Sequence, residues 1–129
     1  MEKILQLLDT LAVESAKGIP IVVEGQHDVS ALRKLDIMGE IITAKSSGKS
    51  LLDVLREVEG RGKREVILLM DFDRRGKEWT RRLTQHLERM KIKPQLHFWS
   101  KLLHLAGRDI KDIEGLASYL ETLRKKSGG

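Results

Sequence analysis

Apolar residues follow two alternating patterns along the chain. In five segments they recur every three or four residues, the spacing that places them on one face of a helix: 3–15, 28–35, 51–58, 79–90 and 113–123. Four shorter apolar runs lie between these segments and predict strands: 21–23, 40–43, 65–70 and 95–99. Because strands and helices alternate, the pattern predicts βαβ units and an α/β fold with a mainly parallel sheet of four strands.

The chain is 129 residues long, which suits a single domain spanning 1–129. Its opening helix, 3–15, is amphipathic, and we expect it either to cover the sheet or to mediate a homodimer. No apolar run approaches the roughly 20 residues that span a bilayer, and the N-terminal segment is too acidic for a signal peptide. The absence of cysteine excludes thiolate catalysis and cysteine-based zinc sites. We therefore expect a soluble, cytoplasmic protein that has no membrane partner.

Two carboxylates directly follow the strongest predicted strand, 65–70. Residues two apart in an extended segment point the same way, so Asp71 and Asp73 can face one point together. A hard cation such as Mg²⁺ takes one or two carboxylates together with water and phosphate oxygens. Capping of the next helix is the alternative, and it explains one aspartate more easily than two.

Glu24 and Gly25 follow the first predicted strand, 21–23, in the same manner. In open α/β sheets the carboxyl ends of the strands meet where ligands bind, and Gly25 would let the backbone turn sharply or approach a ligand closely. If Glu24 converges there with Asp71 and Asp73, the three carboxylates would repel one another without a cation. The alternative for Glu24 is an ordinary exposed side chain at a strand end.

The segment 46–50, Ser-Ser-Gly-Lys-Ser, invites comparison with a phosphate-binding loop. That motif requires a glycine at position 43, which is a threonine, so we exclude a nucleotide-triphosphatase loop. Ser47, Gly48 and Lys49 stay candidates to line a phosphate at a helix N-terminus, while helix capping by serine is the alternative.

Positive charge is concentrated in the second half of the chain. Residues 1–60 carry 7 basic and 10 acidic side chains, whereas residues 61–129 carry 17 basic and 9 acidic ones. Basic residues crowd the fourth predicted helix and the segment just before it, among them Arg74, and Arg75, Arg82 and Arg89 recur every seven residues opposite the apolar stripe. This face is either solvated, with Glu78 paired to Arg82, or a track for a phosphate backbone.

The remaining polar residues suggest structural roles. Asp109, Asp112 and Glu114 precede or open the last helix, where negative charge stabilises the helix dipole, and a role at the site is the alternative. His27 is the one histidine near the predicted crevice, and the four histidines show no spacing typical of metal ligands.

Two motifs together resemble the Toprim domain. They are Val-Val-Glu-Gly-Gln-His-Asp at 22–28 and Asp-Phe-Asp-Arg-Arg-Gly at 71–76. The resemblance covers roughly 18–120, which we take as the core that follows the N-terminal helix. It is closest to the small stand-alone Toprim proteins, which share Gly48-Lys49 and an ending like 111–115, and extends to the Toprim cores of primases and ribosomal-RNA maturation nucleases.

The resemblance implies a three-layer Rossmann-like fold with helices on both faces of the sheet. It implies that Asp71 and Asp73 coordinate Mg²⁺, and that Glu24 binds metal or acts as general acid or base. One or two ions are compatible with this pattern, and Mn²⁺ could substitute. Supporting positions in the matching motifs are Gly25, Asp28, Gly48 and Gly76. Topoisomerase chemistry is not expected, because the only tyrosine, Tyr119, lies in the last predicted helix.

The leading hypothesis is a Mg²⁺-dependent phosphotransfer or nuclease-type module that acts on RNA or DNA. Lys49, Arg74, Arg75 and Arg82 would position the nucleic-acid backbone. The first alternative is a non-catalytic, metal-binding Toprim module that works with a partner protein. The second is a binder of nucleotides or small phosphates at the same strand ends.

Overall fold

The computed structural model describes residues 2–45 and 48–128. Its elements follow in the order α1 (Glu2–Ala16), β1 (Ile21–Val23), α2 (Gln26–Lys34), β2 (Ile41–Thr43), α3 (Leu51–Gly60), β3 (Glu65–Leu69), α4 (Arg74–Arg89), β4 (Lys93–Gln95), α5 (His97–Ala106) and α6 (Ile113–Gly128). The alternation confirms the predicted α/β fold. In this part of the chain, no helix is both long enough and apolar enough to cross a membrane.

The four strands form one parallel sheet in the order β2-β1-β3-β4. In the inner strand β1, Val22 pairs with Ile42 of β2 on one side and with Leu68 of β3 on the other. β4 joins at the edge of the sheet, where Val66 pairs with Pro94. The chain places β2 on one side of β1 and then returns to place β3 on the other. This reversal creates a switch point at the carboxyl ends of β1 and β3.

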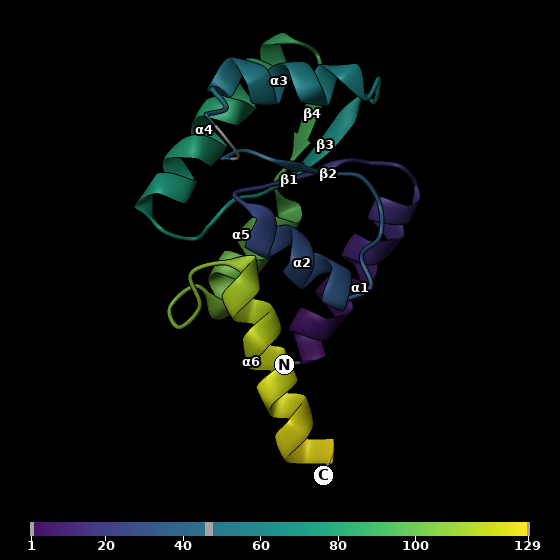
Figure 1. The fold of residues 1–129 in the computed structure, drawn as a ribbon, viewed down its shortest axis with the longest axis vertical. Coiled ribbons are helices and arrows are strands. Elements are labelled where there is room, and N and C mark those ends of the chain that lie inside the picture. Colours follow the sequence, from purple (N-terminus) through teal and green to yellow (C-terminus); the bar gives the residue numbers. More distant parts are fainter. Residues whose placement is uncertain (1, 46–47, 129) are drawn as a thin grey trace.

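Helices cover both faces of the sheet (Figure 1). Successive strand residues point to opposite faces. Ile21 and Val23 therefore pack into the core beneath α1, α2, α5 and α6, whereas Val22 packs into the core beneath α3 and α4. The result is the three-layer Rossmann-like arrangement that the resemblance implied.

The N-terminal helix α1 covers the sheet. Ile4, Leu8 and Leu11 are buried in the same core cluster as the β1 residues Ile21 and Val23. The expected role of covering the sheet is therefore confirmed, and the alternative, mediating a homodimer, stays a prediction.

The prediction of a strand at 95–99 is wrong. β4 is confined to 93–95, and α5 begins at His97, so the sequence pattern missed one helix entirely. The reason is visible in the burial of Phe98, Leu102 and Ala106, which recur every four residues on one helical face. The Trp99 indole N–H also donates to the Met70 carbonyl oxygen at 2.9 Å, which holds α5 against the end of β3.

Candidate functional site

The candidate site lies at the switch point between β1 and β3. Val23 and Leu69 are paired at the ends of these strands, and the chain continues from them into Glu24 and Asp71. The sheet therefore brings two of the predicted metal ligands to the same edge, although they are far apart in the sequence. This is the convergence that the strand-end rule predicts.

Glu24 is a buried carboxylate, and only one of its two oxygens contacts a positively charged group. The residue is 6% exposed, and its Oε2 lies 2.7 Å from the Lys45 ammonium. Its Oε1 is buried and has no hydrogen-bond partner among residues 2–45 and 48–128. Because a buried oxygen without a partner carries a desolvation cost, this atom points to a missing donor or cation.

Asp71 lies close enough to Glu24 for the two carboxyl groups to interact. Burial, followed by the charges of Glu24, Asp28 and Asp112 and a hydrogen bond with Glu24, raises the pKa of Asp71 to about 7. When Asp71 is protonated it can donate to Glu24; when it is ionised, the two carboxylates repel each other. Either a proton or a cation is therefore needed between them.

Asp28 joins the first turn of α2 to the start of α6. Its Oδ2 accepts a hydrogen bond from the Gly25 N–H at 3.2 Å, and its Oδ1 accepts one from the Glu114 N–H at 3.3 Å. Burial raises the pKa of Asp28, while these two hydrogen bonds act in the opposite direction. Asp28 thus ties the start of α2 to α6, and its supporting role at the site stays a prediction.

Asp73 is engaged differently from Asp71. It is exposed and caps α4, because its Oδ1 accepts a hydrogen bond from the Gly76 N–H at 2.8 Å. Gly76 is required sterically, since a Cβ at this position would overlap the backbone carbonyl of Asp71. The capping alternative therefore holds for Asp73 and leaves Asp71 unexplained by it, so metal binding by Asp73 stays a prediction.

The glycine after Glu24 leaves an open space beside the site. Gly25 has extended backbone that any residue adopts (φ −146°), so a sharp turn is not the reason for glycine here. A Cβ at Gly25 would meet nothing within 4 Å. The space in front of it suits close approach of a ligand to the backbone, the second of the two roles expected for this glycine.

Lys49 is held near the end of β2. Its ammonium lies 2.6 Å from Glu57 Oε2 and donates to the Thr43 carbonyl oxygen at 2.8 Å. Gly48, which precedes it, has a φ of +73° that favours glycine. Ser47, the third residue predicted to line a phosphate, lies outside the described residues.

The predicted basic residues of α4 are exposed. Arg74, Arg75 and Arg82 all point away from the core, as a track for a phosphate backbone requires. The expected pairing of Glu78 with Arg82 is wrong, because Glu78 pairs with Arg81, whose Nε donates to it at 3.2 Å. Three residues of spacing bring Arg81 to the same helical face as Glu78.

Two further residues reach this edge. Lys45, two positions after β2, pairs with Glu24, and Asp112 contributes charge at Asp71 while its Oδ1 accepts from the Gly115 N–H at 2.7 Å. Sequence reasoning missed Lys45, which the strand-end rule applied to β2 could have found. For Asp112 the sequence favoured a helix-dipole role over one at the site, and it is the packing of α6 against α2 that brings it there.

Within residues 2–45 and 48–128, no three acidic or histidine side chains are arranged to hold a metal ion by themselves. Glu24 and Asp71 nevertheless fit a hard cation, because one or two carboxylates suffice for Mg²⁺ when water and phosphate oxygens complete its shell. The unpartnered oxygen of Glu24 supplies the place for such a ligand bond. The His27 Nδ1 atom lies 3.9 Å from Glu114 Oε1, and the His27 side chain is largely exposed to solvent.

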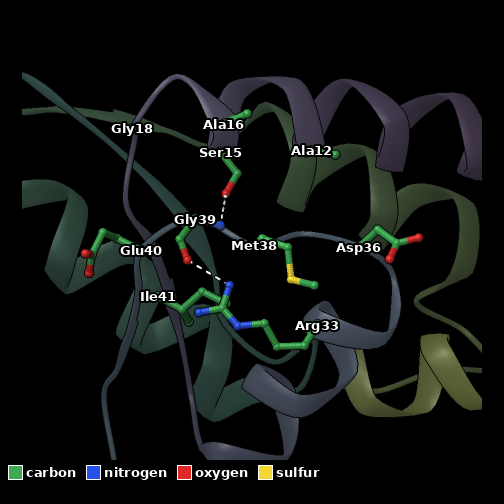
Figure 2. A pocket seen from close by; sticks show the side chains of 10 residues that line it. All are labelled: Ala12, Ser15, Ala16, Gly18, Arg33, Asp36, Met38, Gly39, Glu40 and Ile41. Carbon is green, nitrogen blue, oxygen red and sulfur yellow. Dashed lines mark hydrogen bonds between the residues drawn. The ribbon is translucent and has the colours of Figure 1, made fainter.

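A cavity of about 550 Å³ lies at the opposite, amino-terminal edge of the sheet (Figure 2). Arg33 reaches into it and donates to the carbonyl oxygens of Ile37 at 3.0 Å and Gly39 at 2.8 Å. Ser15 Oγ accepts from the Gly39 N–H at 3.1 Å. These polar groups are matched by the chain itself, in contrast to Glu24.

Comparison with known proteins agrees with this geometry. The family model of the Toprim domain matches residues 18–96, which include both strand ends that carry Glu24 and Asp71. The chain belongs to the Toprim family. Toprim domains are metal-binding modules of nucleases and primases, and they generally bind Mg²⁺.

Relatives of similar size align with this Toprim chain over most of its length. A UPF0292 protein of Methanosarcina barkeri is 35% identical over 128 residues, which cover 99% of this chain and 87% of the relative. A UPF0292 protein of Methanocaldococcus jannaschii is 36% identical over 120 residues, covering 92% and 91%. A solved structure described as a putative protein from Aquifex aeolicus has a TM-score of 0.69 and 28% identity, and the match covers 84% of this chain and 94% of the other. These similarities agree with a stand-alone Toprim protein.

Proposed function

We propose that this Toprim protein catalyses a Mg²⁺-dependent phosphotransfer or nuclease-type reaction on nucleic acid. The observation that carries the proposal is the pair of adjacent carboxyl groups at the switch point, in which Glu24 Oε1 is buried and unpartnered. Buried carboxylate oxygens normally have a hydrogen-bond partner, and a bound cation beside Asp71 would supply one for this oxygen. Membership of a family whose members are metal-binding modules of nucleases and primases supports the same conclusion.

The proposed ligands of the metal are Glu24, Asp71 and Asp73. Glu24 and Asp71 face each other at the strand ends, and Asp73 would contribute the carboxylate oxygen that does not cap α4. Bound Mg²⁺ would withdraw charge from a phosphate and so make its phosphorus easier to attack. Glu24 would also act as general acid or base, because the sheet holds it beside the Asp71 carboxyl group.

The basic residues would hold the rest of the nucleic acid. Arg74 and Arg75 open α4 immediately after the carboxylates, and Arg82 lies two turns further along the exposed face. Lys49 would bind a phosphate only by exchanging its present contacts with Glu57 and Thr43. Their contacts to phosphate would give affinity with little dependence on base sequence.

Thermal unfolding with and without Mg²⁺ or Mn²⁺ tests the metal site. We expect the metal to stabilise the wild type by about 1.4 kcal/mol at a concentration ten times the dissociation constant, because it binds only the folded state. Glu24→Gln and Asp71→Asn should abolish this stabilisation. Asp9→Asn is the matched control, since Asp9 is an exposed aspartate on α1, and it should leave the metal response unchanged.

Cleavage of RNA and DNA oligonucleotides then tests the reaction. We expect metal-dependent cleavage or transfer by the wild type and Asp9→Asn, and none by Glu24→Gln or Asp71→Asn. If neither metal stabilises the wild type even with oligonucleotide present, the proposal is wrong. If nucleotides stabilise the protein and oligonucleotides do not, the site binds small phosphates instead.

A further inference from the structure

Lys45 is fixed to the sheet through its backbone, whereas its side chain is partly exposed to solvent. Its N–H donates to the Glu24 carbonyl oxygen at 2.9 Å, which extends the β1–β2 pairing by two residues. The side chain of Lys45 is 32% exposed, compared with 7% for that of Glu24. The flexible four-carbon stem can therefore swing into solvent without any change in the sheet.

The ammonium of Lys45 occupies the place of a cation at the carboxylate site. It contacts Glu24 Oε2 at 2.7 Å, on the same carboxylate whose other oxygen is buried without a partner. The charges of Asp28 and Asp112 also act on this edge. One lysine charge thus faces several carboxyl groups, and a divalent ion would match them better.

The other lysine of this region has a different role. Lys49 is held by Glu57 and the Thr43 carbonyl oxygen, so contacts outside the carboxylate pair account for its position. Among the residues that the structure describes, Lys45 is the lysine whose ammonium contacts a proposed metal ligand directly.

We propose that Lys45 is an internal counter-ion that neutralises Glu24 in the metal-free protein and is displaced when a divalent metal binds. Lys45 then sets the metal affinity of the site: each binding event must break the Lys45–Glu24 ion pair, and its cost is subtracted from the binding free energy. This inference rests on the proposed metal site and adds a residue that controls it. Lys45 acts here as a positioning residue through Glu24.

The inference is tested by measuring, with calorimetry, how tightly Lys45→Met binds Mn²⁺ alone. We expect this variant to bind Mn²⁺ about tenfold more tightly than the wild type, because the competing charge is gone. The metal-free variant should unfold at a lower temperature, since Glu24 is left buried and unpaired, and Mg²⁺ should recover most of the loss. Lys45→Arg keeps the charge and should bind Mn²⁺ with the affinity of the wild type.

Lys17→Met is the matched control. Lys17 pairs with Glu14 at 3.3 Å on the surface of α1, so the substitution also removes a lysine–glutamate pair. It should change neither Mn²⁺ affinity nor the response of the melting temperature to Mg²⁺. If the metal-free Lys45→Met protein does not fold, we expect Mn²⁺ to restore its folded circular-dichroism spectrum.

Equal or weaker Mn²⁺ binding by Lys45→Met would overturn the inference and leave the proposed function standing, because Lys45 would then support the metal site. Failure of Mn²⁺ to restore an unfolded Lys45→Met protein, while Lys45→Arg folds, would overturn it as well. If neither the wild type nor any Lys45 variant binds Mn²⁺ or Mg²⁺, the inference and the metal-dependent function both fall.

Discussion

The two edges of the sheet both carry charged side chains, but they differ in how those charges are satisfied. At the amino-terminal edge, Arg33 donates to two backbone carbonyl oxygens and Ser15 accepts from a backbone N–H (Figure 2). At the carboxyl-terminal edge, Glu24 has a buried oxygen without a partner, and Asp71 has a pKa raised to about 7. The first edge is complete as it stands, whereas the second is incomplete without a proton or a cation.

This difference separates polar groups that serve the fold from those that serve a ligand. The amino-terminal edge has a cavity, yet its polar groups are matched by neighbouring backbone atoms. The carboxyl-terminal edge keeps carboxyl groups together at a cost in stability. Perturbed carboxyl groups of this kind concentrate at functional sites, because binding and catalysis use the imbalance.

The largest expected effect contrasts one glycine from each edge. In Gly39→Ala the new Cβ would overlap Ser15 Oγ and lie 2.6 Å from the Ser15 carbonyl oxygen, so we expect a loss of about 3 kcal/mol in the free energy of unfolding. In Gly25→Ala the Cβ meets nothing within 4 Å, and we expect a loss of about 1 kcal/mol or less from the weaker helix cap. Urea denaturation measures both.

Metal response gives the reverse contrast for the same two variants. Gly39→Ala, where folded, should keep the stabilisation by Mg²⁺. Gly25→Ala should weaken it if the open space admits the ligand. Equal losses of stability in the two variants would contradict the distinction between a closed and an open edge.

The pH dependence of stability gives a second, smaller effect. The pKa of Asp71 is raised in the folded state, so the folded protein holds this proton more tightly than the unfolded chain, whose carboxyl has a pKa of about 3.9. The stability contributed by this proton is therefore complete below about pH 4. It is lost as the pH rises through about 7.

Asp71→Asn tests this pH dependence in metal-free buffer. The variant should melt a few degrees above the wild type at pH 8, with the difference shrinking toward pH 4. Mg²⁺ should narrow the difference at pH 8 by stabilising the wild type alone. If instead the melting temperatures of the two proteins change in parallel between pH 4 and pH 8, the ionised Asp71 carboxylate is not destabilised by its neighbours.

The smallest effect on stability is expected on the exposed face of α4. Arg75→Gln combined with Arg82→Gln should change the free energy of unfolding by less than about 0.5 kcal/mol, because both side chains are exposed. Nucleic-acid affinity should nevertheless fall, and its slope against salt concentration should decrease by about two. Fluorescence anisotropy over a salt series measures this.

The control for the α4 variant is Lys3→Gln combined with Lys34→Gln, which removes two exposed charges from α1 and α2. It should leave the salt slope unchanged. An equal decrease in both double variants would mean that net charge, and not the track beside the carboxylates, governs the affinity.

The parts of the fold that the sequence predicted are those with a strong local period. The α1 stripe and the β-branched run of β1 are confirmed, because burial of one helical face or of a whole central strand imposes its own spacing. The segment 95–99 was misread, since five residues are too few to separate an apolar strand from the first turn of a helix. The hydrogen bond from the Trp99 indole to Met70, directly after β3, fixes this helix against the sheet, and such a tertiary contact cannot be inferred from local spacing.

For the candidate site, the sequence by itself determined which carboxylates end the strands, because Glu24 and Asp71 follow apolar runs directly. The motif in the sequence also marked Gly76, and the structure explains this glycine by its close packing on the backbone of Asp71. Only the tertiary structure decided how each carboxylate is engaged. Glu24 pairs with Lys45 because β2 lies beside β1, and Asp112 reaches the site because α6 packs against α2. These contacts depend on strand order and helix packing, which arise from the whole core and have no local signature in the chain.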